Sequence, residues 1–208
     1  VLERLATRED EAETGDAESQ FQLGVAFIRG NLGIRKNEAE AVQWLRKAAD
    51  QNHADAQFHL GACFLAGIGV VKDQVEAVRW YRRAAEQNFA KGQTALGACY
   101  NQGAGVARDE VEAIKWFRKA ADQGAALAQV WLGSCYGKGE GVTKDPVEAV
   151  RWFRRAAEQG TALAQNLLGD CYASGNGVEK ADVEAAKWCR KAADQGYALA
   201  QWELGTMY

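Results

Sequence analysis

Apolar positions recur along this chain with a period of 36 residues. Leu-Gly pairs are spaced 37 residues apart once and 36 residues apart four times, and they begin at Leu23, Leu60, Leu96, Leu132, Leu168 and Leu204. Tryptophan repeats at the same interval, at Trp44, Trp80, Trp116, Trp152 and Trp188. A fixed period of this length is typical of repeat proteins, in which each repeat is one supersecondary unit that stacks on its neighbours.

Each repeat is predicted to be a pair of helices. In one repeat, Gln57, Leu60, Gly61 and Phe64 recur at helical spacing, and a second apolar stripe surrounds Trp80. The glycine of the Leu-Gly pair is expected to let the second helix approach closely, with the tryptophan alongside, so that alanine there would destabilise the pair. Ordering 36 residues costs more free energy than one such pair gains by burial, and the repeats must therefore stack to be stable.

Capping residues mark both ends of the second helix. A capping oxygen stands three residues before a glutamate at Asp73, Asp109 and Asp145. The only proline, Pro146, occupies the first helical position, where its missing N–H costs nothing. Ala181 stands at the same cap position in the last complete repeat, and we expect a weaker helix start there. Residue types that accept the left-handed conformation follow the second helices, at Asn52, Asn88, Gly124, Gly160 and Gly196.

Composition excludes several classes of protein. With 48% hydrophobic residues, 25% charged residues and one proline, the chain is not predicted to be disordered. A net charge of -3 provides no positive field that would recruit nucleic acid or an anionic membrane. No apolar run approaches the roughly 18 to 20 residues that span a bilayer, so no membrane insertion is expected. The chain begins at Val1, which leaves open a removed signal peptide, and with it the compartment.

The repeat pattern between Ala126 and Gly160 and its copies resembles the Sel-one-like repeat (SLR) family, whose fold is tetratricopeptide-like. The resemblance implies an all-α fold, a right-handed α-solenoid of about five and a half 36-residue helix-loop-helix repeats. It also implies a scaffold or adaptor, as in endoplasmic-reticulum protein degradation or in bacterial envelope, secretion and host-interaction proteins. We expect one continuous solenoid domain, made of a helix or cap over residues 1–16, repeats over 17–53, 54–89, 90–125, 126–161 and 162–197, and the first helix of a sixth repeat over 198–208.

The C-terminal end is more apolar than a terminal outer face should be, because it carries Trp202, Leu204 and Tyr208. We expect the natural chain to continue beyond it. A solvating last helix and self-association through this end are the alternatives.

Motifs that suggest catalysis have simpler explanations here. The residues around Cys135 read Gly-x-Cys-x-Gly, like a nucleophile elbow, but an elbow follows a strand and this segment is predicted to be helical. The Gly-x-Gly loops lack the third glycine and the preceding strand of a dinucleotide-binding fold, which favours interhelical turns. His53 and His59 are six residues apart and do not share a helix face at metal-ligand spacing. We therefore expect no catalytic residue, metal or cofactor, with hydrolase activity a remote alternative.

The cysteines are predicted to be buried, unbridged side chains. Four of them form one column with a 36-residue spacing, namely Cys63, Cys99, Cys135 and Cys171. Equivalent helices pack about 10 Å apart, which exceeds the limit of ~7 Å between the Cα atoms of a disulfide. A bridge between Cys171 and Cys189 within one repeat is the alternative.

A row of basic residues on the second helices, such as Arg79, Arg82 and Arg83, could form a ridge that binds nucleic acid. Acidic residues in the columns of Glu76 and Glu86 lie three or four residues away and would neutralise the row. A binder of nucleic acid should show unpaired positive charge, so no nucleic-acid partner is expected.

By its resemblance to tetratricopeptide-like folds, the chain should bind a protein or peptide segment in a concave groove lined by the first helices. The columns that vary between repeats and face the groove supply the partner-binding residues. We predict apolar anchors at Phe21, Phe58, Trp131 and Trp202, hydrogen-bonding positions at Asn101, Asn166 and Asp170, and a further contact at His59. One alternative is a glycan of the cell envelope or surface, bound through exposed aromatic side chains. Another is that some of these aromatic residues only pack between repeats.

Overall fold

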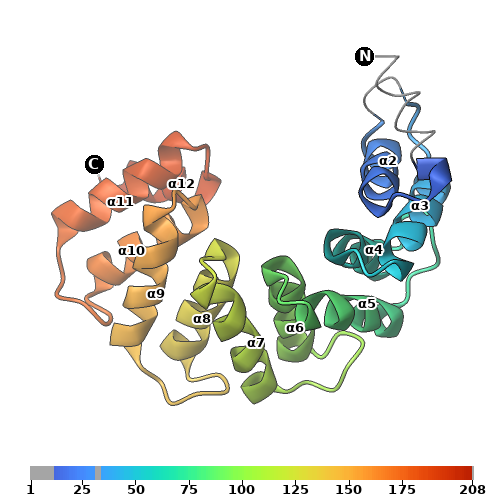
Figure 1. Cartoon of the computed structure of the whole chain (residues 1–208). Helices are drawn as coiled ribbons and strands as arrows, with labels where there is room; N and C mark the ends of the chain where they lie inside the picture. The colour runs from blue at the N-terminus through green and yellow to red at the C-terminus, as the bar shows by residue number, and fades with distance from the viewer. Residues whose placement is uncertain (1–11, 31–33, 208) are drawn as a thin grey trace. The chain divides into compact units, whose positions relative to one another are not determined.

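The computed structural model describes the backbone of residues 12–30 and 34–207 and the side chains of 12–30 and 34–204. Its described residues form helices joined by short turns, with no strand among them. The chain divides into two compact units, residues 1–108 and 109–208. The first unit contains α2 (Ala17–Arg29), α3 (Glu38–Asp50), α4 (Ala54–Ala66), α5 (Gln74–Glu86) and α6 (Ala90–Gln102) (Figure 1). The second contains α7 (Glu110–Asp122), α8 (Ala126–Lys138), α9 (Pro146–Glu158), α10 (Ala162–Ser174), α11 (Asp182–Asp194) and α12 (Ala198–Met207).

The repeat seen in the sequence is reproduced in the helices. Helices α2 to α11 are each 13 residues long. Within each unit, a helix packs against the one that follows it, as α4 does against α5 and α8 against α9. The prediction of paired helices is confirmed.

The predicted caps of the second helices are present. Asp73 Oδ1 accepts hydrogen bonds from the backbone N–H groups of Val75 and Glu76, both at 3.0 Å. Helix α11, which follows Ala181, has no side-chain cap hydrogen bond, as expected from the alanine. In a capping box the glutamate side chain bonds the backbone N–H of the capping residue. Here Glu76 instead forms an ion pair with Arg79 at 3.0 Å.

The left-handed helix ends are also present. Asn52 and Asn88 adopt φ values of 68° and 62°, and Gly124, Gly160 and Gly196 hold the same position with φ between 81° and 87°. Asparagine tolerates this conformation better than other residues with a side chain, which explains its place in the two N-terminal repeats.

The Leu-Gly glycine creates the expected close helix contact, but the residue that fills it is not the tryptophan. A Cβ atom on Gly133 would lie 2.5 Å from the Phe153 ring, and one on Gly61 would lie 2.8 Å from the Tyr81 ring. At Gly24, Gly61, Gly133 and Gly169 the contact is therefore made by the residue that follows the tryptophan. The two neighbours point about 100° apart on the helix, so only one of them can face the glycine.

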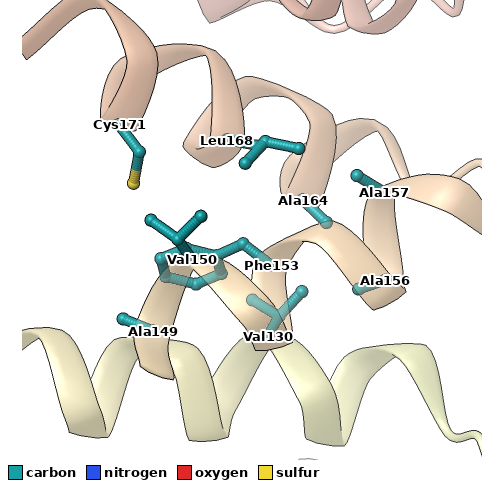
Figure 2. Packing of buried hydrophobic residues seen from close by; sticks show 9 residues of the cluster. All are labelled: Val130, Ala149, Val150, Phe153, Ala156, Ala157, Ala164, Leu168 and Cys171. Atoms are coloured by element: carbon teal, nitrogen blue, oxygen red, sulfur yellow. The ribbon is translucent and has the colours of Figure 1, made fainter. Parts of the chain in front are cut away.

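The apolar core connects successive helices. Figure 2 shows Val150 and Phe153 of α9 between Val130 of α8 and Leu168 of α10, in one buried cluster. In the first unit, Trp80 of α5 belongs to the cluster built from α3 and α4, which includes Leu45, Leu60 and Cys63. The tryptophan thus packs across the preceding repeat, whereas the residue after it packs within its own.

A buried glutamine in the first helix of each complete repeat hydrogen-bonds the backbone that precedes the helix. Gln57 is 0% exposed, and its Nε2 donates to the carbonyl oxygen of Ala49 in α3 at 3.1 Å. Its Oε1 accepts a hydrogen bond of 2.6 Å from Nε2 of Gln87, which follows α5. The same pair of bonds recurs at Gln20, Gln129 and Gln165. The sequence pattern placed Gln57 in an apolar stripe, while the structure shows that this position is buried because its amide is paired on both sides.

The glutamine-to-carbonyl hydrogen bond also ties the described part of the N-terminal segment to α2. Ala12 is buried, and its carbonyl oxygen accepts a hydrogen bond of 2.9 Å from Gln20 Nε2, as Ala49 does from Gln57. Residues 12–16 therefore pack like the end of a second helix. The remainder of the predicted N-terminal helix or cap, residues 1–11, lies outside the described residues.

Replacing Gln129 with leucine is expected to lower the free energy of unfolding by about 1 to 2 kcal/mol, although leucine is more apolar. The substitution removes two hydrogen bonds, one of 3.3 Å to the Ala121 carbonyl, which keeps its bond from the backbone N–H of Gly124, and one of 2.9 Å from Gln159 Nε2. Urea unfolding followed by circular dichroism measures the change. Gln159→Ala, at an exposed position, removes one of the two bonds and should cost about 1 kcal/mol. A leucine variant as stable as the wild type would contradict the linking role.

The second glycine of each Gly-x-Gly loop meets the backbone of the preceding repeat. A Cβ atom on Gly177 would overlap the carbonyl group of Pro146 at the start of α9, and one on Gly105 would overlap that of Gln74 at the start of α5. Both glycines also have positive φ, 76° and 72°. These loops are interhelical turns, as the sequence predicted, and they hold neighbouring repeats in contact.

Candidate partner-binding surface

In the first unit, Phe21 of α2 lies among histidine rings. Its ring stacks on His53 with a centroid distance of 4.9 Å and meets His59 edge-on at 5.2 Å. His59 is held in turn by its Nδ1 atom, which lies 2.8 Å from the carbonyl oxygen of Asp55. Two of the predicted partner-binding residues, Phe21 and His59, are therefore brought together from α2 and α4.

His53 has a structural function that the sequence pattern did not reveal. Its Nδ1 atom accepts a hydrogen bond of 3.1 Å from the backbone N–H of Ala56, so that the imidazole caps α4. Because Nδ1 is the acceptor, the proton of the neutral ring is on Nε2, which donates to Glu18 at 3.0 Å. Hydrogen bonds, first from Gln22 and then from His53, lower the pKa of the Glu18 carboxyl. The sequence feature that indicates this capping role is the position of His53, which directly precedes α4.

Phe58 is half-buried on the adjacent part of α4. Its ring lies 5.8 Å from Tyr81 of α5 and 6.1 Å from Phe89, measured between centroids. Asn101 of α6 is also half-buried, and its Oδ1 atom has no hydrogen-bond partner among the described residues. Phe58 therefore both packs in its unit and leaves part of its ring accessible.

In the second unit, Trp131 of α8 stacks on Phe117 of α7. The ring planes differ by 3° and the centroids are 5.5 Å apart, and Trp131 is half-buried. Trp202 of α12 is different, because 67% of its surface is exposed. Of the two predicted anchors in this unit, Trp131 therefore has one ring face packed against Phe117, whereas the side chain of Trp202 is largely exposed.

Asn166 and Asp170 lie one turn apart on α10. Asn166 Nδ2 donates to Asp170 Oδ2 at 3.3 Å. Desolvation by the surrounding protein, and then the negative charge of Glu203 on α12, raise the pKa of Asp170 to about 6. Glu203 was not among the predicted binding residues, although it follows Trp202 directly.

The basic row of the second helices is engaged within each unit. Its first column pairs with the capping-box glutamates, as Arg151 does with Glu148 at 3.1 Å. Its second column donates to tyrosine hydroxyls in the next repeat, as Arg154 does to Tyr172 at 2.6 Å. Its third column lies over the tryptophan rings, as at Arg83, Lys119, Arg155 and Lys191. The glutamates therefore neutralise one column only, and aromatic residues hold the other two.

The cysteines do not provide a nucleophile. All five are buried and free, so the alternative bridge between Cys171 and Cys189 is absent. Burial is the main cause that raises the pKa of each thiol to about 11. Cys135 lies inside α8, not after a strand, and the resemblance of its surroundings to a nucleophile elbow has no structural basis.

The described residues lack two further features. They hold no group of three or more histidine, cysteine, aspartate or glutamate side chains that could bind a metal ion. None of their helices has the length and apolar character needed to span a membrane.

Comparisons with known proteins match the repeat. The family model for the Sel1 repeat matches residues 17–53, 54–89, 90–124, 126–161 and 162–197. The chain is similar to the solved structure of a protective antigen of uropathogenic Escherichia coli strains, which displays an SLR fold, with a TM-score of 0.90 and 41% identity over 98% of this chain and 44% of that chain. It is also similar to a Sel1 repeat protein from Oxalobacter formigenes, with a TM-score of 0.86 and 39% identity over 91% of this chain and 75% of that chain.

A sel1-like repeat-containing protein of Acanthamoeba polyphaga mimivirus is 43% identical over 42 residues, which are 20% of this chain and 7% of the viral protein. The chain therefore spans less than half the length of the Escherichia coli structure and a small part of the viral protein. The five matched segments and the two structures confirm the predicted all-α solenoid of repeats of about 36 residues.

Proposed function

Because the chain belongs to the Sel1 repeat family, whose members are generally protein-interaction scaffolds, we propose that it is a non-catalytic scaffold that binds a protein or peptide segment. The binding surface is the side of the first helices that carries the predicted columns, in each of the two units. Phe21, Phe58 and His59 contribute in the first unit, and Trp131 and Trp202 in the second.

The observation that carries this proposal is the pair of half-buried aromatic rings on first helices, Phe58 in the first unit and Trp131 in the second. Aromatic residues contribute more binding free energy in an interface than most residues. Each of the two rings is already positioned by an aromatic neighbour, Tyr81 for Phe58 and Phe117 for Trp131. Rings positioned in this way lose little conformational entropy when a partner covers them.

Affinity capture from the native source, followed by mass spectrometry, tests the proposal. We expect a protein to be recovered with the wild-type chain and lost with Trp202→Ala and with the double variant Phe58→Ala/Trp131→Ala. Circular dichroism and thermal melting must first show that each variant is folded. Val147→Ala is the matched control, because Val147 is 52% exposed on a second helix, outside the proposed surface.

Equal recovery by the wild type and both aromatic variants would move the binding site away from the first helices. If the double variant unfolds, Phe58 and Trp131 belong to the core, and of the predicted aromatic anchors only Phe21 and Trp202 remain. A glycan is the second candidate ligand. It would be supported by a calorimetric titration in which an envelope polysaccharide binds the wild type but not Trp202→Ala.

A further inference from the structure

The loop between α10 and α11 contains Asn176 followed by Gly177, the only asparagine-glycine pair in the chain. The corresponding positions before the glycine of the other described loops hold Ile68, Ala104 and Glu140. An asparagine side chain can react with the backbone nitrogen of the next residue, because the two groups lie within reach of each other. A following glycine leaves that nitrogen open, since it has no Cβ atom.

Neither reacting group of this pair is engaged by the rest of the described chain. The side chain of Asn176 is exposed, and its amide forms no hydrogen bond with a described residue. The backbone N–H of Asn176 donates to the Cys171 carbonyl at 3.1 Å, but the N–H of Gly177 donates to no described residue. The fold thus fixes the backbone before the asparagine and leaves the side-chain amide and the attacking nitrogen without partners.

The packing of the repeats requires the glycine that makes this pair reactive. Gly177 has a φ angle of 76°, and a Cβ atom there would overlap the carbonyl group of Pro146 at the start of α9. A side chain at this position would shield the nitrogen from attack, but it would not fit the contact. The preceding loop makes the same kind of contact without an asparagine, because Gly141 meets the backbone of Glu110 and follows Glu140.

We propose that Asn176 is a site of spontaneous deamidation. The backbone nitrogen of Gly177 attacks Cγ of Asn176, and the bond from Cγ to Nδ2 breaks. The proton of the Gly177 N–H leaves with the amino group as ammonia, and a succinimide ring remains. Water then opens the ring at either carbonyl, which yields aspartate or isoaspartate. The chain supplies both reacting groups, water is the co-reactant, and nothing is oxidised or reduced.

The two products have different effects on the loop. Aspartate changes the charge of an exposed side chain and leaves the backbone as it was. Isoaspartate brings the side-chain Cβ atom into the main chain, so the backbone between residues 176 and 177 becomes longer. The hydrogen bond to Cys171 fixes one side of this link, and the contact with Pro146 fixes the other. Isoaspartate should therefore displace the loop from α9 and weaken the contact between the two repeats.

The test is incubation of the folded full chain in mildly alkaline buffer, which favours loss of the proton from the attacking nitrogen. Peptide mapping by mass spectrometry locates the converted residue, and an isoaspartyl methyltransferase labels the isoaspartate. We expect Asn176 to convert at least about 10-fold faster than every other asparagine of the chain, since all the others precede residues with side chains. Asn176→Gln is the matched control and should abolish this fast modification. Glu140→Asn should create a second fast site before Gly141.

Thermal unfolding measures the effect of each product on stability. The isoaspartate form, separated by chromatography after the incubation, should unfold at a midpoint about 5 °C or more below that of the untreated chain. Asn176→Asp carries the charge of the other product on an unaltered backbone, and its midpoint should stay within about 2 °C of the wild type. The comparison separates the effect of the longer backbone from that of the added charge.

Two results would overturn the site. In the first, Asn176 stays intact in the folded chain but is converted in the chain unfolded by guanidinium chloride, which would show that the loop prevents the attack. In the second, another asparagine of the folded chain converts as fast as Asn176. Equal unfolding midpoints for the isoaspartate form and Asn176→Asp would overturn the predicted displacement of the loop. Because the reaction needs no partner, these outcomes are independent of the capture experiment that tests the proposed function.

Discussion

Replacing Gly177 with alanine is expected to lower the free energy of unfolding of residues 109–208 by about 3 kcal/mol or more. Two costs add at this position. The φ angle of 76° lies in the left-handed region, where a Cβ atom costs about 1 to 2 kcal/mol. The Cβ atom would also overlap the backbone carbonyl of Pro146, which cannot move aside without displacing the start of α9.

Gly160→Ala is the matched control for Gly177→Ala. Gly160 has a φ angle of 87°, and nothing lies within 4 Å of the position that a Cβ atom would occupy. Alanine there pays only the conformational cost, about 1 to 2 kcal/mol, and asparagine should cost less because Asn52 and Asn88 hold the equivalent positions in other repeats. Chemical denaturation of the three variants measures the difference. Equal destabilisation by the two alanine substitutions would show that the close contact with Pro146 is not required.

Trp80→Ala is expected to cost about 3 to 5 kcal/mol, because it empties a large volume in the core. Trp80 is 4% exposed and packs with Leu60 and Cys63 in the cluster that joins α3, α4 and α5. Arg83 covers the ring at 4.7 Å and would also lose its aromatic partner. Thermal and urea unfolding, monitored by circular dichroism, give the change in stability. A loss below about 1 kcal/mol would contradict the packing across repeats.

Two further substitutions separate the contributions of the Trp80 side chain. Trp44→Ala should cost clearly less than Trp80→Ala, because Trp44 holds the equivalent position but is only half-buried. Trp80→Phe should retain much of the stability, since the buried indole Nε1 atom has no hydrogen-bond partner among the described residues and its removal breaks no bond. A phenylalanine variant as unstable as the alanine variant would indicate that the indole nitrogen is bonded after all.

The candidate binding surface was predictable only in part. The variable columns of the first helices pointed to Trp202, which is exposed, and to Asp170, whose pKa is raised. They did not show that Asn166 is buried with one free acceptor, or that Glu203 acts on Asp170. Helical periodicity places a residue on a face of its own helix, whereas burial and pKa depend on the neighbouring helix and its rotation.

Local chemistry in the sequence by itself determined the architecture. The 36-residue period, the caps at Asp73, Asp109 and Asp145, and the left-handed positions at Asn52 and Asn88 set the length, the start and the end of each helix. These features act between residues a few positions apart, and a stacked array then follows because no single repeat buries enough apolar surface to be stable.

Only the tertiary structure decided which residues meet between helices. It placed Phe153, not the tryptophan before it, against Gly133, and it set the backbone of Pro146 against Gly177. It also paired the amide of Gln129 with the carbonyl of Ala121 in α7 and with Gln159, directly after α9. Such contacts depend on the distance and rotation between helices that are packed together, and a short stretch of sequence does not specify these quantities because side chains from several helices set them jointly.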